Sequence, residues 1–307
     1  MIEIGRAQVV LCTHNPNWWR TMYNAVGRML CLLCSALLVA NTVHADETKL
    51  NVLMIIVDDL APVLSSYGGP VETPALDSLA AEGVRFTNNY ANAPVCGASR
   101  ASFLSGLAPT ASRFLSYDAR LDQEVENAVS LPAYFQNEGW HTLANGKVFD
   151  VIADSSSGWS EPVWSPEHTW FGKDPDERGE HLQAAYIEPS YIGRPPYFEK
   201  LDVEDSAYPD GQIAVKTAAD LHRLAKSDKP FFLAVGFRKP HLPFNAPAAY
   251  WSPEKREEEP GNLPATWHAP AQDIPKDALH RSLELRGQYD ALPLFGDPND
   301  GEASEII

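Results

Sequence analysis

The sequence predicts an α/β fold in which a mainly parallel sheet is flanked by helices. Two runs, residues 50–57 and 231–236, are apolar apart from Asn51, which is typical of strands buried on both faces. Segments with helix signals alternate with these strands along the chain, as in parallel α/β proteins. The composition, 44% hydrophobic and 21% charged, is that of a folded globular protein and excludes a disordered or collagen-like chain.

Helix start and stop signals define the expected helices. Thr73 and Pro74 begin a short helix that Gly83 ends, because Thr is favoured at the N-cap and Pro is tolerated in the first turn. Further helices are expected from Cys96 to about residue 106, over 130–139, and from 210 to about 226 with Asp210 as its cap.

The remaining segments are assigned by the same reasoning. Residues 84–90 and 140–144 are expected to form strands. The stretches 151–209 and 256–275 are rich in turn residues and lack periodicity, so both are expected to be long structured loops, and 276–292 is expected to form a last helix.

Residues 1–45 are expected to be a secretory signal with an over-long first part, which leaves 46–307 as the folded protein. Arginines precede an apolar run over 29–40, and a small-residue pattern at 43–45 resembles a cleavage site. Translation from Met22 or Met29 remains open. Twelve apolar residues are too few to span a bilayer, so we expect an exported protein, periplasmic or secreted, without a membrane span after cleavage.

The charge and the cysteine content of the chain narrow the range of possible functions. The chain has 41 acidic and 24 basic residues, a net charge of −17, which argues against nucleic acid as a partner because phosphate binding needs clustered cations. Three of the four cysteines lie in the expected signal, so Cys96 is the only cysteine of 46–307. A lone cysteine is ordinarily a buried, inert one, and only its neighbours favour a reactive role.

Polar side chains follow three of the expected strands. Asp58 and Asp59 follow the first, Lys147 follows the strand at 140–144, and His241 follows the strand at 231–236. Ligands of parallel α/β sheets bind at the carboxyl ends of the strands. Paired carboxylates there suggest a divalent cation such as Ca²⁺ or Mg²⁺, although an Asp-Asp pair alone is more often a solvated turn. Cys96 and Arg100 lie at an expected helix start, where an anion is favoured.

The segment 94–106, Pro-Val-Cys-Gly-Ala-Ser-Arg-Ala-Ser-Phe-Leu-Ser-Gly, resembles the sulfatase family, whose nucleophile lies in Cys-x-Pro-x-Arg before a helix of small residues. Further matches follow in order at 51–59, 68–86, 145–149 and 231–244. The last two, with Gly-Lys-Val-Phe and Lys-Pro-His-Leu-Pro-Phe, are most similar to the iduronate-2-sulfatase-like branch. The resemblance covers about residues 50–247 and implies an alkaline-phosphatase-like fold.

The resemblance implies a sulfuric ester hydrolase acting on a sulfated polysaccharide or oligosaccharide. Cys96 would be converted to formylglycine by a maturase, and Asp58, Asp59 and residue 96 would hold Ca²⁺, with Mg²⁺ as the alternative. Arg100 would hydrogen-bond the modified residue. Lys147 and His241 would hold sulfate oxygens, and one of them would protonate the departing alcohol.

Three features depart from the family pattern. Ala98 replaces the motif's proline, and Asp150 stands where the iduronate-type branch has histidine. A carboxylate beside bound sulfate is repulsive unless it turns away or meets a cationic part of the substrate, so Asp150 is a candidate substrate-binding residue. No Asp-His or Asp-Asn metal pair follows His241, and we therefore expect a C-terminally truncated member of the family.

Two other functions stay open from the sequence. A phosphoester hydrolase of the same superfamily would share the geometry of the site, but Thr or Ser would be expected at position 96. An inactive or anion-binding remnant is the alternative that the missing metal ligands favour. Individually, His241, Lys147 and Arg100 could each be ordinary structural side chains, and only their joint placement favours an active site.

Overall fold

The structure is a computed structural model that describes residues 49–166 and 197–251, together with Gly287 and Tyr289. The chain divides into two units, 1–49 and 50–307, and every element described below belongs to the second. The expected signal at 1–45 and the expected loop at 256–275 lie outside the described residues. So does nearly all of the expected helix at 276–292.

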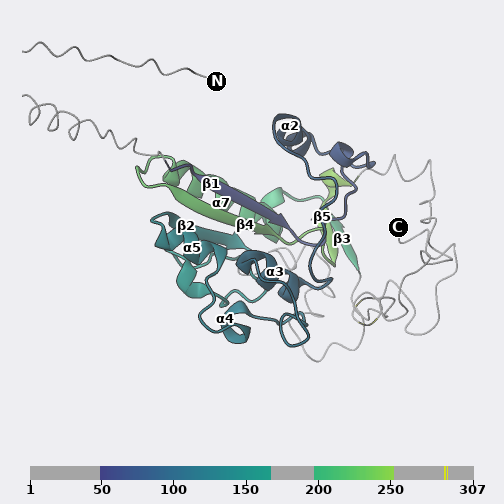
Figure 1. Ribbon diagram of the computed structural model, residues 1–307. Coiled ribbons are helices and arrows are strands. Elements are labelled where there is room, and N and C mark those ends of the chain that lie inside the picture. Colours follow the sequence, from purple (N-terminus) through teal and green to yellow (C-terminus); the bar gives the residue numbers. More distant parts are fainter. Residues whose placement is uncertain (1–48, 167–196, 252–286, 288, 290–307) are drawn as a thin grey trace, which may run out of the picture. The chain divides into compact units, whose positions relative to one another are not determined.

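The central sheet has the strand order β1-β4-β2 and is parallel throughout (Figure 1). Its strands are β1 (Val52–Val57), β4 (Phe231–Phe237) and β2 (His141–Gly146). The first six residues of β4 are buried, as expected for a middle strand with helices on both faces. The predicted α/β fold with a mainly parallel sheet is therefore confirmed.

The prediction that the first strand is buried on both faces is wrong. Leu53 and Ile55 of β1 are 44% and 48% exposed, whereas Val52, Met54 and Ile56 pack against the core. Side chains alternate between the faces of a strand, so one face of β1 is packed and the other is half open among the described residues.

Four predicted helices are confirmed: α2 (Pro74–Glu82), α3 (Cys96–Ser105), α5 (Leu131–Asn137) and α7 (Pro209–Leu224). Ser130 caps α5 by accepting a hydrogen bond from the Ala133 N–H, and Gly106 ends α3 in the left-handed conformation at φ 71°. The short helix α4 (Leu121–Glu124) was not predicted. Short 3₁₀ turns are η1 (Ser65–Tyr67), η2 (Ser156–Gly158), η3 (Asp205–Ala207) and η4 (Ala248–Tyr250).

Three sequence predictions are corrected here. Residues 84–90 form no strand, and Val84 and Tyr90 are each 83% exposed, so residue types that favour strands were not sufficient to form one here. The stretch 151–209, predicted as loops, contains β3 (Phe198–Leu201), which pairs in parallel with β5 (Phe244–Pro247). Asp210 lies in the first turn of α7 rather than at its cap, which is Tyr208.

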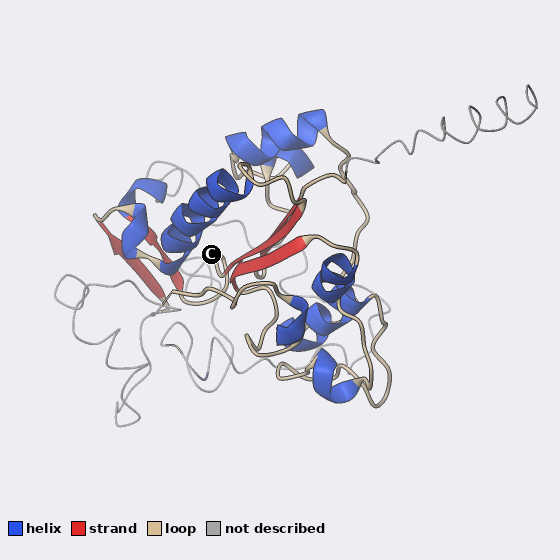
Figure 2. Cartoon of the chain, turned by 90° about the vertical axis from the view of Figure 1, so that its left-hand side faces the viewer, coloured by secondary structure: helices blue, strands red, loops and turns tan. Residues whose placement is uncertain are grey.

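Two apolar clusters cover the two faces of the sheet, and helices lie on either side of its strands (Figure 2). Phe232 and Ala234 of β4 face the cluster that contains Ala101 and Leu104 of α3. The alternate residues of β4 face a second cluster, which α7 completes with Ile213 and Leu224. The core thereby fixes α3 and α7 on opposite faces of one sheet.

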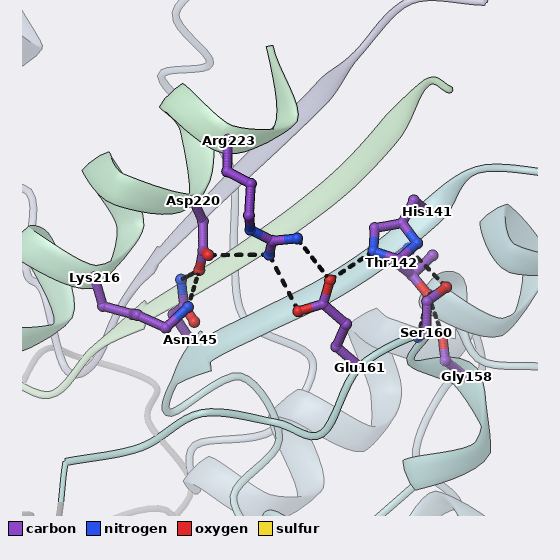
Figure 3. Close-up of polar contacts among 9 residues, drawn as sticks. All are labelled: His141, Thr142, Asn145, Gly158, Ser160, Glu161, Lys216, Asp220 and Arg223. Carbon is purple, nitrogen blue, oxygen red and sulfur yellow. Dashed lines mark hydrogen bonds and ion pairs between the residues drawn. The ribbon is translucent and has the colours of Figure 1, made fainter. Parts of the chain in front are cut away.

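A polar network joins α7 to β2 (Figure 3). The Asn145 side chain, 1% exposed, donates to Asp220 Oδ2 at 3.0 Å and to Thr217 Oγ1 at 3.3 Å. Asp220 also pairs with Lys216 and Arg223, and Arg223 reaches Glu161 at 2.9 Å. These bonds satisfy the polar groups that this face of the sheet buries.

Leu53 and Leu233 are paired across β1 and β4. Core packing predicts that replacing each of them by Ala lowers the free energy of unfolding by a different amount. Leu233→Ala is expected to lower the free energy of unfolding by about 2–5 kcal/mol, because Leu233 is fully buried and its loss leaves a cavity. Leu53→Ala, at a side chain 44% exposed, should cost less than half as much. Urea unfolding followed by circular dichroism measures both, and equal costs would contradict the assigned core.

Candidate functional site

The candidate site lies at the carboxyl edge of the central sheet, where the three strands end. The Asp58 N–H donates to the Phe237 carbonyl at 3.1 Å, and the Lys147 N–H donates to the Gly236 carbonyl at 2.9 Å. A side chain at position 236 would clash here, since a Cβ atom would lie 1.8 Å from the Lys147 carbonyl oxygen. The close approach of these backbones brings Asp58 and Lys147 together across β4.

Asp58 is the centre of a buried ion cluster. Its Oδ1 accepts from Arg100 Nη2 at 2.6 Å, and its Oδ2 accepts from Lys147 Nζ at 2.7 Å. Arg100 also donates through Nη1 to the carbonyls of Lys147 and Val148, at 2.5 and 2.7 Å. Asp58, Arg100 and Lys147 are all at most 5% exposed.

The charges of this cluster support one another. Burial opposes ionisation of Asp58, but the Arg100 and Lys147 cations outweigh it and hold the pKa of the carboxyl below its usual range. Burial likewise opposes the Lys147 cation, and the charges of Asp58 and Asp150 overcome it and raise the pKa of the ammonium group. Asp58 and Lys147 are therefore both charged at neutral pH.

Cys96 is the first residue of α3, beside this cluster. Its Sγ lies 4.0 Å from Asp59 Oδ1. Burial raises the pKa of the thiol to about 11; Lys147 opposes this rise, and the carboxylates of Asp58, Asp59 and Asp150 add to it. The thiol is therefore protonated at neutral pH, although it lies at a helix start where an anion is ordinarily favoured.

His241 approaches the same point from the segment after β4. Its Nε2 lies 3.7 Å from Asp59 Oδ2, and its Nδ1 lies 2.7 Å from the Leu242 carbonyl oxygen. A carbonyl only accepts hydrogen bonds, so Nδ1 carries the proton and Nε2 of the neutral ring carries the lone pair. The Nε2 atom that faces the aspartates can thus take up a proton or ligate a metal.

A donor set that fits a metal ion is present. One ligand atom each from Asp58, Cys96 and His241 lie within 4.8 Å of one another. Asp59 is next to all three, with a side chain 55% exposed and a backbone in the left-handed region at φ 57°. The two carboxylates are ligands that Ca²⁺ and Mg²⁺ prefer, whereas a thiol and an imidazole suit softer ions.

All seven residues singled out in the sequence are brought to this edge of the sheet. Asp150, the seventh, contacts Lys147: its Oδ1 lies 3.0 Å from the Lys147 Nζ. Lys147 thus lies between two carboxylates, those of Asp58 and Asp150.

Sequence reasoning missed three charged residues next to the site: Asp210, Arg238 and Lys239. Arg238 is 6% exposed, and the charges of Asp58 and Asp150 act on it. Burial lowers the pKa of Lys239 to about 8, against the opposing effect of Asp210. The Lys-Pro-His segment pointed to Lys239, but no sequence signal linked it to Asp210, which lies on another element.

Comparison with known proteins assigns the family. The model of the family described as "Sulfatase" matches residues 50–292, more than half of the chain. The chain belongs to the sulfatase family. It is 32% identical to human iduronate 2-sulfatase over 88% of this chain and 50% of that protein. It is 30% identical to a sulfatase of Formosa agariphila over 72% of this chain and 45% of that protein.

The chain spans about half the length of these curated sulfatase relatives.

Among solved structures, the phosphonate monoester hydrolase of Agrobacterium radiobacter matches with a TM-score of 0.47 and 23% identity, over 67% of this chain and 44% of that one. Within the described residues, no helix is both long and apolar enough to cross a membrane.

The raised thiol pKa predicts slow, strongly pH-dependent alkylation of unmodified Cys96 in this sulfatase. Because the thiolate reacts and the pKa is about 11, the rate with iodoacetamide should rise about tenfold for each pH unit between pH 7 and 10. Mass spectrometry of the peptide containing residue 96 measures this rate. A plateau near pH 9, as for an ordinary free cysteine, would contradict the assigned environment.

The ion cluster predicts losses of stability of very different size when either of the two neighbouring aspartates is replaced. Asp58→Asn leaves two buried cations without their carboxylate and is expected to lower the free energy of unfolding by about 3 kcal/mol, while Asp59→Asn at an exposed side chain should change it by less than about 0.5 kcal/mol.

The effect of Asp58→Asn should also depend on pH. The folded-state pKa of Asp58 is lowered, so its contribution is fully present above the ordinary carboxyl pKa of 3.8 and is lost as the pH falls through the lowered value. Denaturant unfolding at pH 7 and at pH 3 measures both variants. A pH-independent difference between wild type and Asp58→Asn would contradict the charge assignment.

Proposed function

We propose that this sulfatase-family chain hydrolyses sulfate monoesters of a sulfated polysaccharide or oligosaccharide. The observation that carries the proposal is the convergence of two buried cations, Arg100 and Lys147, on the carboxylate next to residue 96. An anionic ester needs fixed positive charge around the point of attack, and buried cations that are held in place provide it without reorganisation. The similarity to iduronate 2-sulfatase supports a sugar sulfate as the substrate class.

The nucleophile in this proposal is a formylglycine made from Cys96 by a maturase. A thiol with a pKa of about 11 is protonated at neutral pH and is a poor nucleophile, so the unmodified side chain is unsuited to the reaction. Conversion to a hydrated aldehyde supplies a hydroxyl nucleophile at the same position. The Ala98 that replaces the motif's proline does not disturb α3, where it is fully buried.

Asp58, Asp59 and residue 96 would hold the metal, Ca²⁺ or alternatively Mg²⁺. Two carboxylates and an oxygen in place of the sulfur form an oxygen-rich donor set, which is the set these ions prefer. The ion supplies positive charge that offsets the sulfate and favours ionisation of the attacking hydroxyl.

The other residues bind the sulfate group and move protons. Lys147 and His241 would hold sulfate oxygens, and one of them would protonate the departing alcohol, His241 doing so only after its Nε2 has taken up a proton. Arg100 donates to Asp58 and to two carbonyls, which holds both the carboxylate and the chain at Lys147 in position. Asp150 forms an ion pair with Lys147. In this proposal, its carboxylate would also bind a cationic or hydrogen-bond-donating part of the substrate.

Residues 1–45 are proposed to be a cleaved signal peptide, so that the enzyme acts outside the cytoplasm, in the periplasm or as a secreted protein. An extracellular polysaccharide as the substrate is consistent with export.

Parallel assays of an aryl sulfate and an aryl phosphate, each with and without Ca²⁺, test the proposed function. We expect sulfate turnover that needs Ca²⁺, that falls to background in Cys96→Ala, and that decreases about 10²–10³-fold in Lys147→Ala, because the transition state loses a fixed cation. Mass analysis of residue 96 in protein from the native host shows whether the modification is present.

Each other result of the assays identifies an alternative. Turnover of the phosphate alone would identify a phosphoester hydrolase, which the superfamily relationship allows. Weak sulfate binding without any turnover would identify an anion-binding remnant.

A further inference from the structure

We propose that Asp210 is a positioning residue that fixes the segment carrying His241 beside residue 96. The catalytic consequence rests on the proposed function, whereas the positioning itself is a property of the fold. Asp210 lies 31 residues before His241 in the sequence and comes from a different element, the first turn of α7.

The contacts of Asp210 are directed at the backbone where β4 ends. Its Oδ1 accepts from the Arg238 N–H at 2.9 Å, and its Oδ2 accepts from the N–H groups of Arg238 and Lys239 at 3.1 and 2.9 Å. The His241 N–H then donates to the Arg238 carbonyl at 3.1 Å. One carboxylate therefore fixes the turn from which the imidazole projects toward Asp59.

Asp210 is itself held rigidly. Ile213 and Leu224 anchor α7 in the apolar cluster under β4, and Gly211 packs so closely on η3 that a Cβ atom there would lie 1.9 Å from the Asp205 carbonyl oxygen. At the other end of the helix, Asp220 ties α7 to Asn145 of β2 (Figure 3). A group that orients another must be fixed more firmly than the group it orients, and Asp210 satisfies this condition.

Burial shows that the contacts of Asp210 are not incidental surface bonds. Burial raises the pKa of the Asp210 carboxyl, and the backbone hydrogen bonds from Arg238 and Lys239 oppose that rise. A carboxylate removed from water is stabilised by the N–H groups it accepts from, so the helix and the turn depend on the same bonds.

Lys239 adds support from within the segment, and Phe244 at its end pairs with β3. Lys239 Nζ donates to the carbonyls of His241 and Pro243, at 3.0 and 2.5 Å. These bonds fix the shape of the segment, but they do not fix its position relative to the sheet. Among the contacts described for this segment, those of Asp210 join it to a helix anchored in the core.

Hydrogen exchange of the full 307-residue chain tests the positioning independently of activity. Asp210→Asn replaces one acceptor oxygen by a donor that faces N–H groups, so exchange of residues 238–244 should accelerate roughly tenfold or more, while 231–236 stays protected. Asp220→Asn makes the same substitution on the same helix and should leave 238–244 unchanged. Unchanged exchange at 238–244 in Asp210→Asn, or equal acceleration in both variants, would overturn the proposal.

A double-mutant cycle with an aryl sulfate tests the catalytic consequence. Asp210→Asn should lower kcat about tenfold or more in the wild-type background and have little further effect in the His241→Gln background, because the two residues act as one unit. Asp210→Glu, which keeps both acceptor oxygens, should restore part of the rate. Equal losses in both backgrounds, or no rescue by Glu, would show a merely structural role and overturn the proposal.

The two experiments separate this proposal from the proposed function. If the wild-type chain turns over no aryl sulfate, the proposed function fails, and hydrogen exchange alone then decides whether Asp210 positions the segment. If turnover is present but hydrogen exchange of residues 238–244 is unaffected by Asp210→Asn, the proposed function is supported and the positioning role of Asp210 is contradicted.

Discussion

The site depends on one carboxylate, that of Asp58, which two buried cations share. Removing three charges from water is costly, and their attraction compensates only where geometry and further hydrogen bonds are favourable. Here Arg100 donates to two carbonyls besides Asp58, and Lys147 has Asp150 as a second partner. Two cations and two carboxylates form a group without net charge, which explains how so many ionised side chains are buried at one strand edge.

The parallel sheet makes this arrangement possible. Asp58, Lys147 and Arg238 follow β1, β2 and β4, and the carboxyl ends of parallel strands meet at one edge although these residues are far apart in the sequence. Helices from opposite faces complete the site: α3 supplies Cys96 and Arg100 from one side, and α7 supplies Asp210 from the other. The packing of each helix on the sheet therefore fixes the relative positions of chemically distinct groups.

Sequence patterns pointed to the residues that the structure brings together at this edge of the sheet, but not to the contacts that hold them there. The apolar run at 231–236 and the motif around Cys96 predicted their elements correctly, because local signals define a buried strand and a helix start. Residues 84–90, which contain β-branched and aromatic side chains, were misassigned as a strand, since strand formation also needs a pairing partner that local sequence does not reveal. The role of Asp210 was missed for the same reason, because its side chain bonds across the fold instead of capping its own helix.

The electrostatics at residue 96 oppose a negative charge on its side chain. A helix start and a nearby lysine ordinarily lower the pKa of a thiol, yet burial and three carboxylates raise it to about 11. The same surroundings would oppose any negative charge that develops on an oxygen at this position. A divalent ion between Asp58 and Asp59 would reverse that balance, since two of the opposing carboxylates would become its ligands. The carboxylates that suppress ionisation without metal are thus the groups that would permit it when metal is bound.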